Sequence, residues 1–218
     1  MRRTAAVVGA FLALLALTAC VPDDPTGDPT SGGPGSASSS SDGQHRTPKP
    51  NQLCDTADKG EHDLPEVDFA DVQWTVPSGF VSSSAYSEEF PLEGDYIGLY
   101  AGPDDGIDTL NALGIVVYPQ LELGPLMDAC SRISDEAIDA RLAQYHEIAP
   151  STVLEGPDRT EVAGLPAVME VLELPDYSWR TYWIFGRDQM MQVVCQWTDH
   201  RDRVEAACVD LVASIRFG

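Results

Sequence analysis

An apolar run near the amino terminus, from Thr4 to Leu17, determines how much of this 218-residue chain is available to fold. Arg2 and Arg3 precede it, and a run of this length is typical of the centre of a secretory signal. The run is too short for a helix that crosses about 30 Å of hydrocarbon, and no later stretch approaches about 18 consecutive apolar residues. We therefore predict that residues 1–19 are a signal peptide and that the mature chain is exported.

The residues that close this segment, Leu17-Thr18-Ala19-Cys20, resemble the lipobox of bacterial lipoproteins. The resemblance implies cleavage before Cys20 and a thioether-linked diacylglycerol on its sulfur. Cys20 would then anchor the chain at the extracytoplasmic face of the cell membrane, because two acyl chains hold stably where one binds reversibly. The alternative is an ordinary secretory signal with an incidental cysteine.

The charge balance restricts the partners of the mature chain. The sequence holds 35 Asp and Glu residues against 13 Lys and Arg residues, a formal net charge of −22. Nucleic acids are bound through clusters of Lys and Arg, so we exclude them as partners. An anionic membrane surface would also repel such a chain. The sequence therefore predicts that membrane contact is made through the lipidated Cys20.

Residues 20–53 are rich in Pro, Gly, Ser and Thr and contain almost no large apolar side chains. Such a segment cannot bury enough apolar surface to offset the entropy of ordering the chain. We interpret it as a flexible linker with a mean reach of about 30 Å, the alternative being a glycosylated stalk. Residues 54–218 are long enough for a single domain with its own core.

The sequence of this domain alternates between strand and helix patterns. Runs of β-branched and aromatic residues between turn residues predict strands over 71–77, 95–101 and 112–119, and two more within 151–175 that meet at Gly164 and Pro166. A hairpin is expected over 177–197, with its turn near 186–188. Apolar periodicity and end signals predict helices over 125–133, over 134–148 with Ser134 as its cap, and over about 198–216.

Four cysteines remain beside Cys20, and they are Cys54, Cys130, Cys195 and Cys208. An even number of thiols in an exported chain predicts two disulfides, whereas the alternative, a zinc site, usually contains closer cysteine pairs. The strand period places Cys195 on an apolar face of the hairpin, and the helical period places Cys208 on the apolar face of the last helix. Packing of these faces on each other predicts Cys195–Cys208, and elimination then gives Cys54–Cys130.

Three motifs resemble those of PsbP-like domains: Trp-Thr-Val-Pro-x-Gly-Phe over 74–80, Val-x-Gly-x-Pro-Ala over 162–167, and an aromatic hairpin followed by a helix ending in Leu-Val-Ala-Ser-Ile-Arg-Phe over 211–217. Actinobacterial envelope lipoproteins of the LpqN/LpqT type share this fold and best match the lipobox and linker. The resemblance implies an α+β fold, an antiparallel sheet with helices packed against it, and a binding module without catalytic residues. A second similarity is to the extracellular sensor domains of actinobacterial kinases.

Few residues follow the patterns of catalytic or metal-binding chemistry. The sequence contains no G-x-S-x-G, P-loop or dinucleotide-binding pattern. We expect no enzyme and no cofactor, with an envelope hydrolase as the alternative. The acidic segments 58–66 and 103–108 offer oxygen ligands that suit calcium, but we interpret both as solvated loops. Of the histidines, one lies in the first of these loops, His62, and three are expected at the surface, His45, His146 and His200.

Aromatic residues are concentrated in the hairpin over 177–197. Strand alternation places Trp179 and Trp183 on one face and Tyr182 on the other. One face belongs to the core, and an uncovered second face would give a binding patch, for which the candidates are Trp179, Arg180, Tyr182 and Trp183. From the anchor, the long linker and the absence of a catalytic pattern, we expect a membrane-anchored, non-enzymatic binding or assembly module of the cell envelope with a protein partner. The alternative is a carrier or sensor of a small ligand, a lipid or a metabolite.

Overall fold

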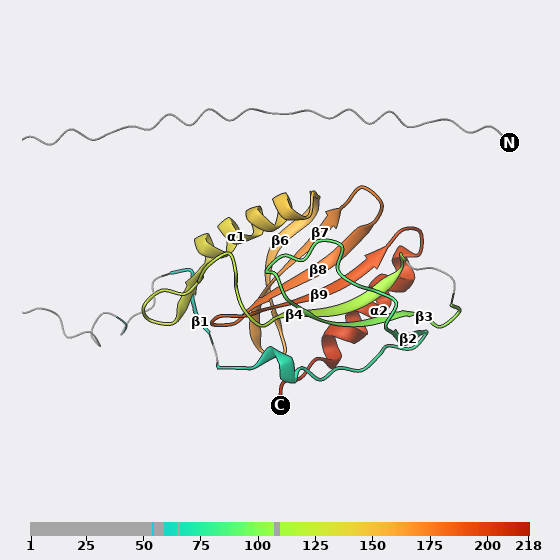
Figure 1. The fold of residues 1–218 in the computed structure, drawn as a ribbon, viewed down its shortest axis with the longest axis horizontal. Helices are drawn as coiled ribbons and strands as arrows, with labels where there is room; N and C mark the ends of the chain where they lie inside the picture. Colours follow the sequence, from blue (N-terminus) through green and yellow to red (C-terminus); the bar gives the residue numbers. More distant parts are fainter. Residues whose placement is uncertain (1–53, 55–58, 65, 107–109) are drawn as a thin grey trace, which may run out of the picture. The chain divides into compact units, whose positions relative to one another are not determined.

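The computed structural model describes residues 54, 59–64, 66–106 and 110–218. Their middle layer is a seven-stranded antiparallel sheet in the order β2-β3-β4-β9-β8-β7-β6 (Figure 1). Helices α1 (Asp135–Ile148) and α2 (Arg201–Ser214) cover its two faces. This is the α+β architecture predicted from the sequence. Residues 1–53, which include the predicted signal peptide, Cys20 and the linker, lie outside the described residues.

The strands of the large sheet are mostly joined as neighbouring hairpins. They are β2 (Phe80–Ser83), β3 (Ile97–Pro103), β4 (Ala112–Tyr118), β6 (Thr152–Val162), β7 (Leu165–Glu173), β8 (Ser178–Phe185) and β9 (Met190–Trp197). A separate two-stranded antiparallel sheet pairs β1 (Glu61–Asp63) with β5 (Arg132–Ser134). The pairing of β4 with β9 joins the strands β2–β4 to the strands β6–β9 in one sheet.

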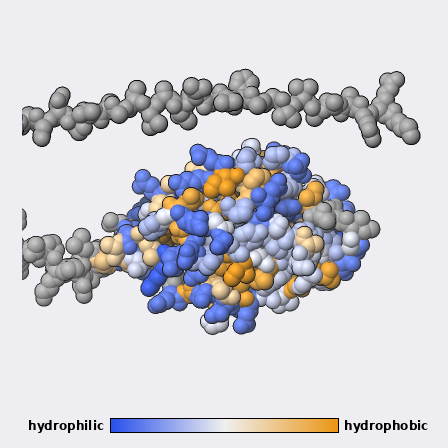
Figure 2. All heavy atoms as spheres, in the orientation of Figure 1, coloured by the Kyte–Doolittle hydropathy of each residue, from blue (hydrophilic) through white to orange (hydrophobic). Residues whose placement is uncertain are grey.

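Each face of the large sheet buries its own apolar core, because the central strands carry large apolar side chains in both directions. On one face, β9 residues such as Met191 and Val193 pack against Val204 and Leu211 of α2. On the other face, Trp183 and other large side chains of β7 and β8 pack against α1. On the side of the domain seen in Figure 2, hydrophobic residues at the surface form separate groups among hydrophilic ones.

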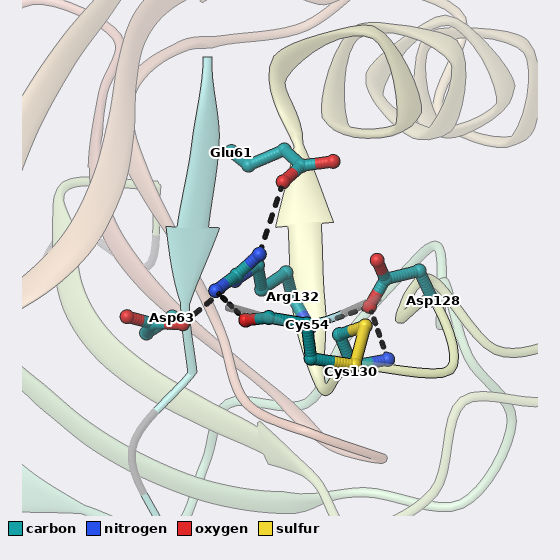
Figure 3. The surroundings of a disulfide bond; sticks show 6 residues. All are labelled: Cys54, Glu61, Asp63, Asp128, Cys130 and Arg132. Atoms are coloured by element: carbon teal, nitrogen blue, oxygen red, sulfur yellow. Dashed lines mark hydrogen bonds and ion pairs between the residues drawn. A yellow bond between two sulfur atoms is a disulfide. The ribbon is translucent and has the colours of Figure 1, made fainter. Parts of the chain in front are cut away.

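Both predicted disulfides are present. Cys195 on β9 is bonded to Cys208 on α2, with their Cα atoms 5.8 Å apart, so this bond joins the sheet to the helix that covers it. Cys54 is bonded to Cys130, with a Cα separation of 5.4 Å. Arg132 on β5 adds a second link to Cys54, because its Nη2 donates a hydrogen bond to the Cys54 carbonyl at 2.7 Å (Figure 3).

The predicted helix over 125–133 is wrong. Asp128 Oδ1 accepts hydrogen bonds from the backbone N–H groups of Cys130 at 2.8 Å and of Arg132 at 2.9 Å. Ser131 has a positive φ of 61°, a conformation that a helix does not contain. The aspartate side chain thus holds the backbone in a turn that competes with helical hydrogen bonds, and the chain leaves this turn as β5.

The predicted strand over 71–77 is reduced to a single β-bridge, between Gln73 and Arg216. A 3-10 helix, Phe69–Asp71, precedes it, and Asp68 caps this helix by accepting a hydrogen bond from the backbone N–H of Ala70. The segment packs Val72, Trp74 and Val76 against the core on the α2 face without joining the large sheet.

Candidate functional site: two cavities on the α1 face

The predicted aromatic patch of Trp179, Arg180, Tyr182 and Trp183 does not exist as one surface. Trp179 and Trp183 are 3% and 1% exposed and lie in the core beneath α1. Arg180 and Tyr182 lie on the opposite face of β8, where Arg180 forms an ion pair with Glu205 of α2 at 3.1 Å. The prediction is wrong because both faces of β8 are covered, so that its aromatic side chains form no open patch for a partner.

His146 was expected at the surface, but its ring is directed toward the sheet. Its Nε2 lies 3.1 Å from Oε2 of Glu170, a carboxylate on β7 that is 0% exposed. The same oxygen accepts a hydrogen bond from Trp183 Nε1 at 2.8 Å. A buried carboxylate needs such partners, so His146 has a structural role. The other described histidines, His62 and His200, are partly and largely exposed.

The acidic segments form ion pairs with arginines. Glu61 and Asp63 lie on β1, which replaces the expected loop, and both contact Arg132, at 3.6 and 3.1 Å (Figure 3). In the second segment, Asp104 and Asp105 contact Arg203 of α2 at 3.1 and 2.7 Å. Among the residues that the structure describes, no group of three His, Cys, Asp or Glu side chains is placed to hold a metal ion.

A cavity of about 290 Å³ lies on the α1 face, where the start of α1 meets β5 and the hairpin of β6 and β7. We call it the apolar cavity, because its wall is formed mainly by Leu64, Ile133, Ile138, Pro166, Val168 and Phe185. Three titratable side chains, His62, Arg159 and Glu161, also line it, and His62 and Arg159 are each about one-third exposed. An apolar wall with a few placed polar groups is the usual form of a small-molecule site.

Ion pairs hold the polar side chains of the apolar cavity in place. His62 Nε2 and Arg159 Nε both approach Oδ1 of Asp135, at 3.0 and 2.9 Å. Arg159 Nη2 also donates to Asp139 Oδ1 at 2.7 Å. The hydrogen bond from His62, together with the charge of Arg159, lowers the pKa of Asp135 below its ordinary value. The first turn of α1 therefore fixes His62 and Arg159 beside the apolar wall.

A second cavity, of about 220 Å³, lies at the other end of β8 on the same face. The segment that connects β2 with β3 contributes Glu88 and Glu89, and the sheet contributes Tyr100 and Trp179. We call it the acidic cavity, because these two carboxylates are its charged groups and no basic side chain is among its described lining residues.

Tyrosine hydroxyls position both carboxylates of the acidic cavity. Tyr100 Oη donates to Glu88 Oε1 at 3.0 Å, and Tyr177 Oη donates to Glu89 Oε2 at 3.1 Å. Burial raises the pKa of Glu88 to about 7, although the hydrogen bond from Tyr100 opposes this effect. Burial and the neighbouring glutamates raise the pKa values of both tyrosines, so their hydroxyls stay protonated and continue to donate.

The raised pKa of Glu88 predicts a pH-dependent gain of stability when this carboxyl is neutralised. Its pKa is about 7 in the folded chain against 4.5 for the unperturbed group, so the folded state binds the extra proton and Glu88 lowers stability as pH rises from 4.5 through 7. We expect Glu88→Gln to raise the free energy of unfolding by about 1–3 kcal/mol at pH 8. Near pH 4.5 it should have little effect, because the wild-type carboxyl is protonated there in the folded chain.

Urea unfolding at the two pH values checks this prediction. Glu147→Gln is the matched control, because Glu147 is exposed on α1 and its replacement should change the free energy of unfolding by less than about 0.5 kcal/mol at either pH. A Glu88→Gln effect of the same size at pH 4.5 and pH 8 would contradict the assignment.

The sequence indicated neither cavity. Glu88, Glu89, Tyr100 and Tyr177 lie in segments that share no short motif, and only the pairing of β4 with β9 brings them together. The aromatic concentration in the hairpin was the one available signal, and it does contribute Trp179 to the acidic cavity and Phe185 to the apolar cavity.

Comparison with known proteins finds no family model and no curated protein that matches the chain. Among solved structures, the chain is similar to the solution structure of cyanobacterial PsbP (CyanoP) from Synechocystis sp. PCC 6803. The TM-score is 0.41 at 8% sequence identity, over 72% of this chain and 91% of that chain. That protein is of the type that the sequence motifs resemble, and a likeness of this degree bears on neither the ligands nor the partners of this chain.

Proposed function

We propose that the chain is an extracytoplasmic lipoprotein, held at the cell membrane through Cys20, whose domain is a non-enzymatic binding module for a small, mainly apolar ligand. The observation that carries this proposal is the apolar cavity of about 290 Å³, with His62 and Arg159 beside its apolar wall. An exposed aromatic patch would have favoured the expected protein partner, but the tryptophans of that patch are buried. The cavity therefore favours the small-ligand alternative.

The location of the domain rests on the sequence and on the disulfides. The Leu17-Thr18-Ala19-Cys20 motif supports lipidation, and the bonds Cys54–Cys130 and Cys195–Cys208 are of a kind that persists in oxidising compartments outside the cytoplasm. Kinship with actinobacterial envelope lipoproteins is part of the same proposal and is supported by the lipobox, the linker and the PsbP-like motifs. In the described part of the chain, no helix has the length and hydropathy needed to cross a bilayer.

The size and lining of the apolar cavity restrict the ligand. Burial of about six methylene groups would contribute about 5 kcal/mol, whereas micromolar affinity requires about 8 kcal/mol. The remaining free energy has to come from a polar head group, for which Arg159 and His62 supply the donors. A short acyl chain or a comparable apolar body with a polar head fits both requirements.

Filling the apolar cavity tests this function. Glu161 is exposed on β6 and lines the cavity from the same face of the strand as Arg159, so Glu161→Trp should occupy the site without disturbing the core. In native mass spectra of protein purified from membranes, we expect a small bound ligand whose occupancy falls at least ten-fold in this variant. Thr152→Trp, an exposed position on the same strand that does not line the cavity, should keep the ligand. Equal spectra for all three proteins, or a co-purifying protein subunit in place of a small ligand, would contradict the proposal.

A further inference from the structure

We propose that the acidic cavity is a second binding site, specific for a small organic cation: an ammonium group that carries an oxygen acceptor a few bonds away. This site is formed by residues other than those of the apolar cavity. The inference is therefore independent of the proposed apolar ligand.

Aromatic side chains form two walls of the acidic cavity. Tyr86 and Tyr100 form one pair of tilted rings, with centroids 6.1 Å apart, and Tyr177 and Trp179 form another, with centroids 5.9 Å apart. The faces of such rings attract ammonium groups, and the attraction is larger where the cation is desolvated. Gly114 on β4 allows the Tyr100 ring to pack closely against the strand, since a Cβ there would lie 3.0 Å from that ring.

The two carboxylates of the cavity lack a positive partner. Glu88 and Glu89 each accept one hydrogen bond from a tyrosine, and neither forms an ion pair with a basic side chain of the described residues. One oxygen of each carboxylate is thus left available for a ligand. Glu88 is partly buried and Glu89 is exposed; a partly buried negative charge without compensation, with a second one beside it, favours a cation over a neutral molecule of the same shape.

A third group indicates that the ligand also carries an acceptor. Trp179 is 3% exposed and lines the cavity, and its indole Nε1 donates to no atom of the described residues. Buried donors in folded proteins are nearly always satisfied. An ammonium compound with a hydroxyl oxygen supplies the acceptor that Trp179 lacks together with the charge that Glu88 and Glu89 lack.

The volume of the site limits the ligand to a small molecule. A cavity of about 220 Å³ corresponds to about seven water molecules at about 30 Å³ each. Choline, which combines a quaternary ammonium group with a hydroxyl group, is of this size and is therefore a suitable probe of the site.

Isothermal titration calorimetry at pH 8 with the intact protein tests the site. We expect choline to bind, and its neutral carbon isostere, 3,3-dimethyl-1-butanol, to bind at least ten-fold more weakly. Tetramethylammonium, which has no hydroxyl, should be several-fold weaker than choline. Phosphocholine should also be weaker than choline, because its phosphate adds negative charge beside two carboxylates, and this result would assign the site to free ammonium compounds over lipid head groups. Tighter binding of phosphocholine would reverse that assignment and leave the cation site intact.

Variants separate the roles of the individual groups. Glu88→Gln and Glu89→Gln should each weaken choline at least ten-fold, whereas Glu147→Gln, an exposed position on α1, should not change its affinity. In Trp179→Phe, choline and tetramethylammonium should bind equally, because the indole donor is lost. The thermal unfolding temperature of each variant establishes that it is folded. Equal affinities for choline and its neutral isostere, or no binding of choline at 10 mM to the folded wild-type protein, would overturn the inference.

Discussion

Replacement of Arg141 by methionine is expected to lower the free energy of unfolding by about 3–5 kcal/mol. Arg141 on α1 is 4% exposed and forms an ion pair with Glu93, which is 1% exposed. The guanidinium also donates from Nη2 to the Gly124 carbonyl at 2.7 Å. Arg141→Met therefore leaves a buried carboxylate without its cation and a carbonyl without its donor, and both effects destabilise the folded state.

The surroundings of Glu93 explain why this carboxylate cannot simply move into solvent. Its Oε1 also accepts a hydrogen bond from Tyr145 Oη at 2.5 Å, and its Oε2 accepts one from the Leu123 backbone at 3.0 Å. Burial, followed by the hydrogen bond to Glu93, raises the pKa of Tyr145, so this hydroxyl remains a donor. Glu93 lies in the segment that connects β2 with β3, and Leu123 lies in the segment that connects β4 with β5. The contacts of Glu93 therefore join both segments to α1.

Guanidinium chloride unfolding measures this effect, and two controls isolate its cause. In the double variant Arg141→Met with Glu93→Leu no charge stays buried, so it should be more stable than Arg141→Met alone. Arg201→Met removes a largely exposed arginine that pairs with Glu155 and Glu205, and it should lower the free energy of unfolding by less than about 1 kcal/mol. A loss below about 1 kcal/mol for Arg141→Met would show that the buried pair does not hold α1 on the sheet.

Removal of the Cys54–Cys130 disulfide should have an effect of similar size. The bond closes a loop with a sequence separation of 76 residues, for which restriction of the unfolded chain predicts about 4–4.5 kcal/mol of stabilisation. The Cys195–Cys208 bond closes a loop with a separation of only 13 residues, which predicts about 3 kcal/mol on the same basis. Cys54→Ala with Cys130→Ala should therefore be the more damaging of the two double replacements.

Unfolding in denaturant without reductant, followed by tryptophan fluorescence, compares the two variants. The variant Cys195→Ala with Cys208→Ala is the reference. It also lacks two cysteines and one disulfide, but the disulfide that it lacks closes the shorter loop. Arg132 would remain bonded to residue 54 in the alanine variant through the backbone carbonyl, so the local contact in Figure 3 is retained in part. A smaller loss for the Cys54–Cys130 pair than for the Cys195–Cys208 pair would mean that the two bonds do not stabilise the protein mainly by restricting the unfolded chain.

Local signals along the chain were sufficient for the elements whose residues interact with near neighbours. Ser134 begins α1 as predicted, with its Oγ accepting a hydrogen bond from Ala137 N at 3.1 Å. The hairpin of β8 and β9 and the pairing of Cys195 with Cys208 followed from the two-residue strand period and the helical period. In each case the pattern and the structure involve segments that are adjacent in sequence.

The features that were missed depend either on local side-chain hydrogen bonds or on contacts between distant segments. The turn at Asp128, which replaces the expected helix, follows from side-chain hydrogen bonds to the backbone that apolar periodicity does not detect. The burial of Trp179 and Trp183 depends on α1 crossing the sheet, and the sequence of the hairpin alone does not reveal which helix covers which face. Both cavities form where such distant segments meet, so their residues carry no motif.

The native mass spectrum of wild-type protein extracted from membranes decides whether the chain is a lipid-anchored binding module. The proposed function predicts a mature chain that begins at Cys20, carries a diacylglyceryl group, retains both disulfides and holds a small ligand that Glu161→Trp loses. A chain that still begins at Met1, or one with an unmodified Cys20 and no bound ligand, would contradict the proposed function.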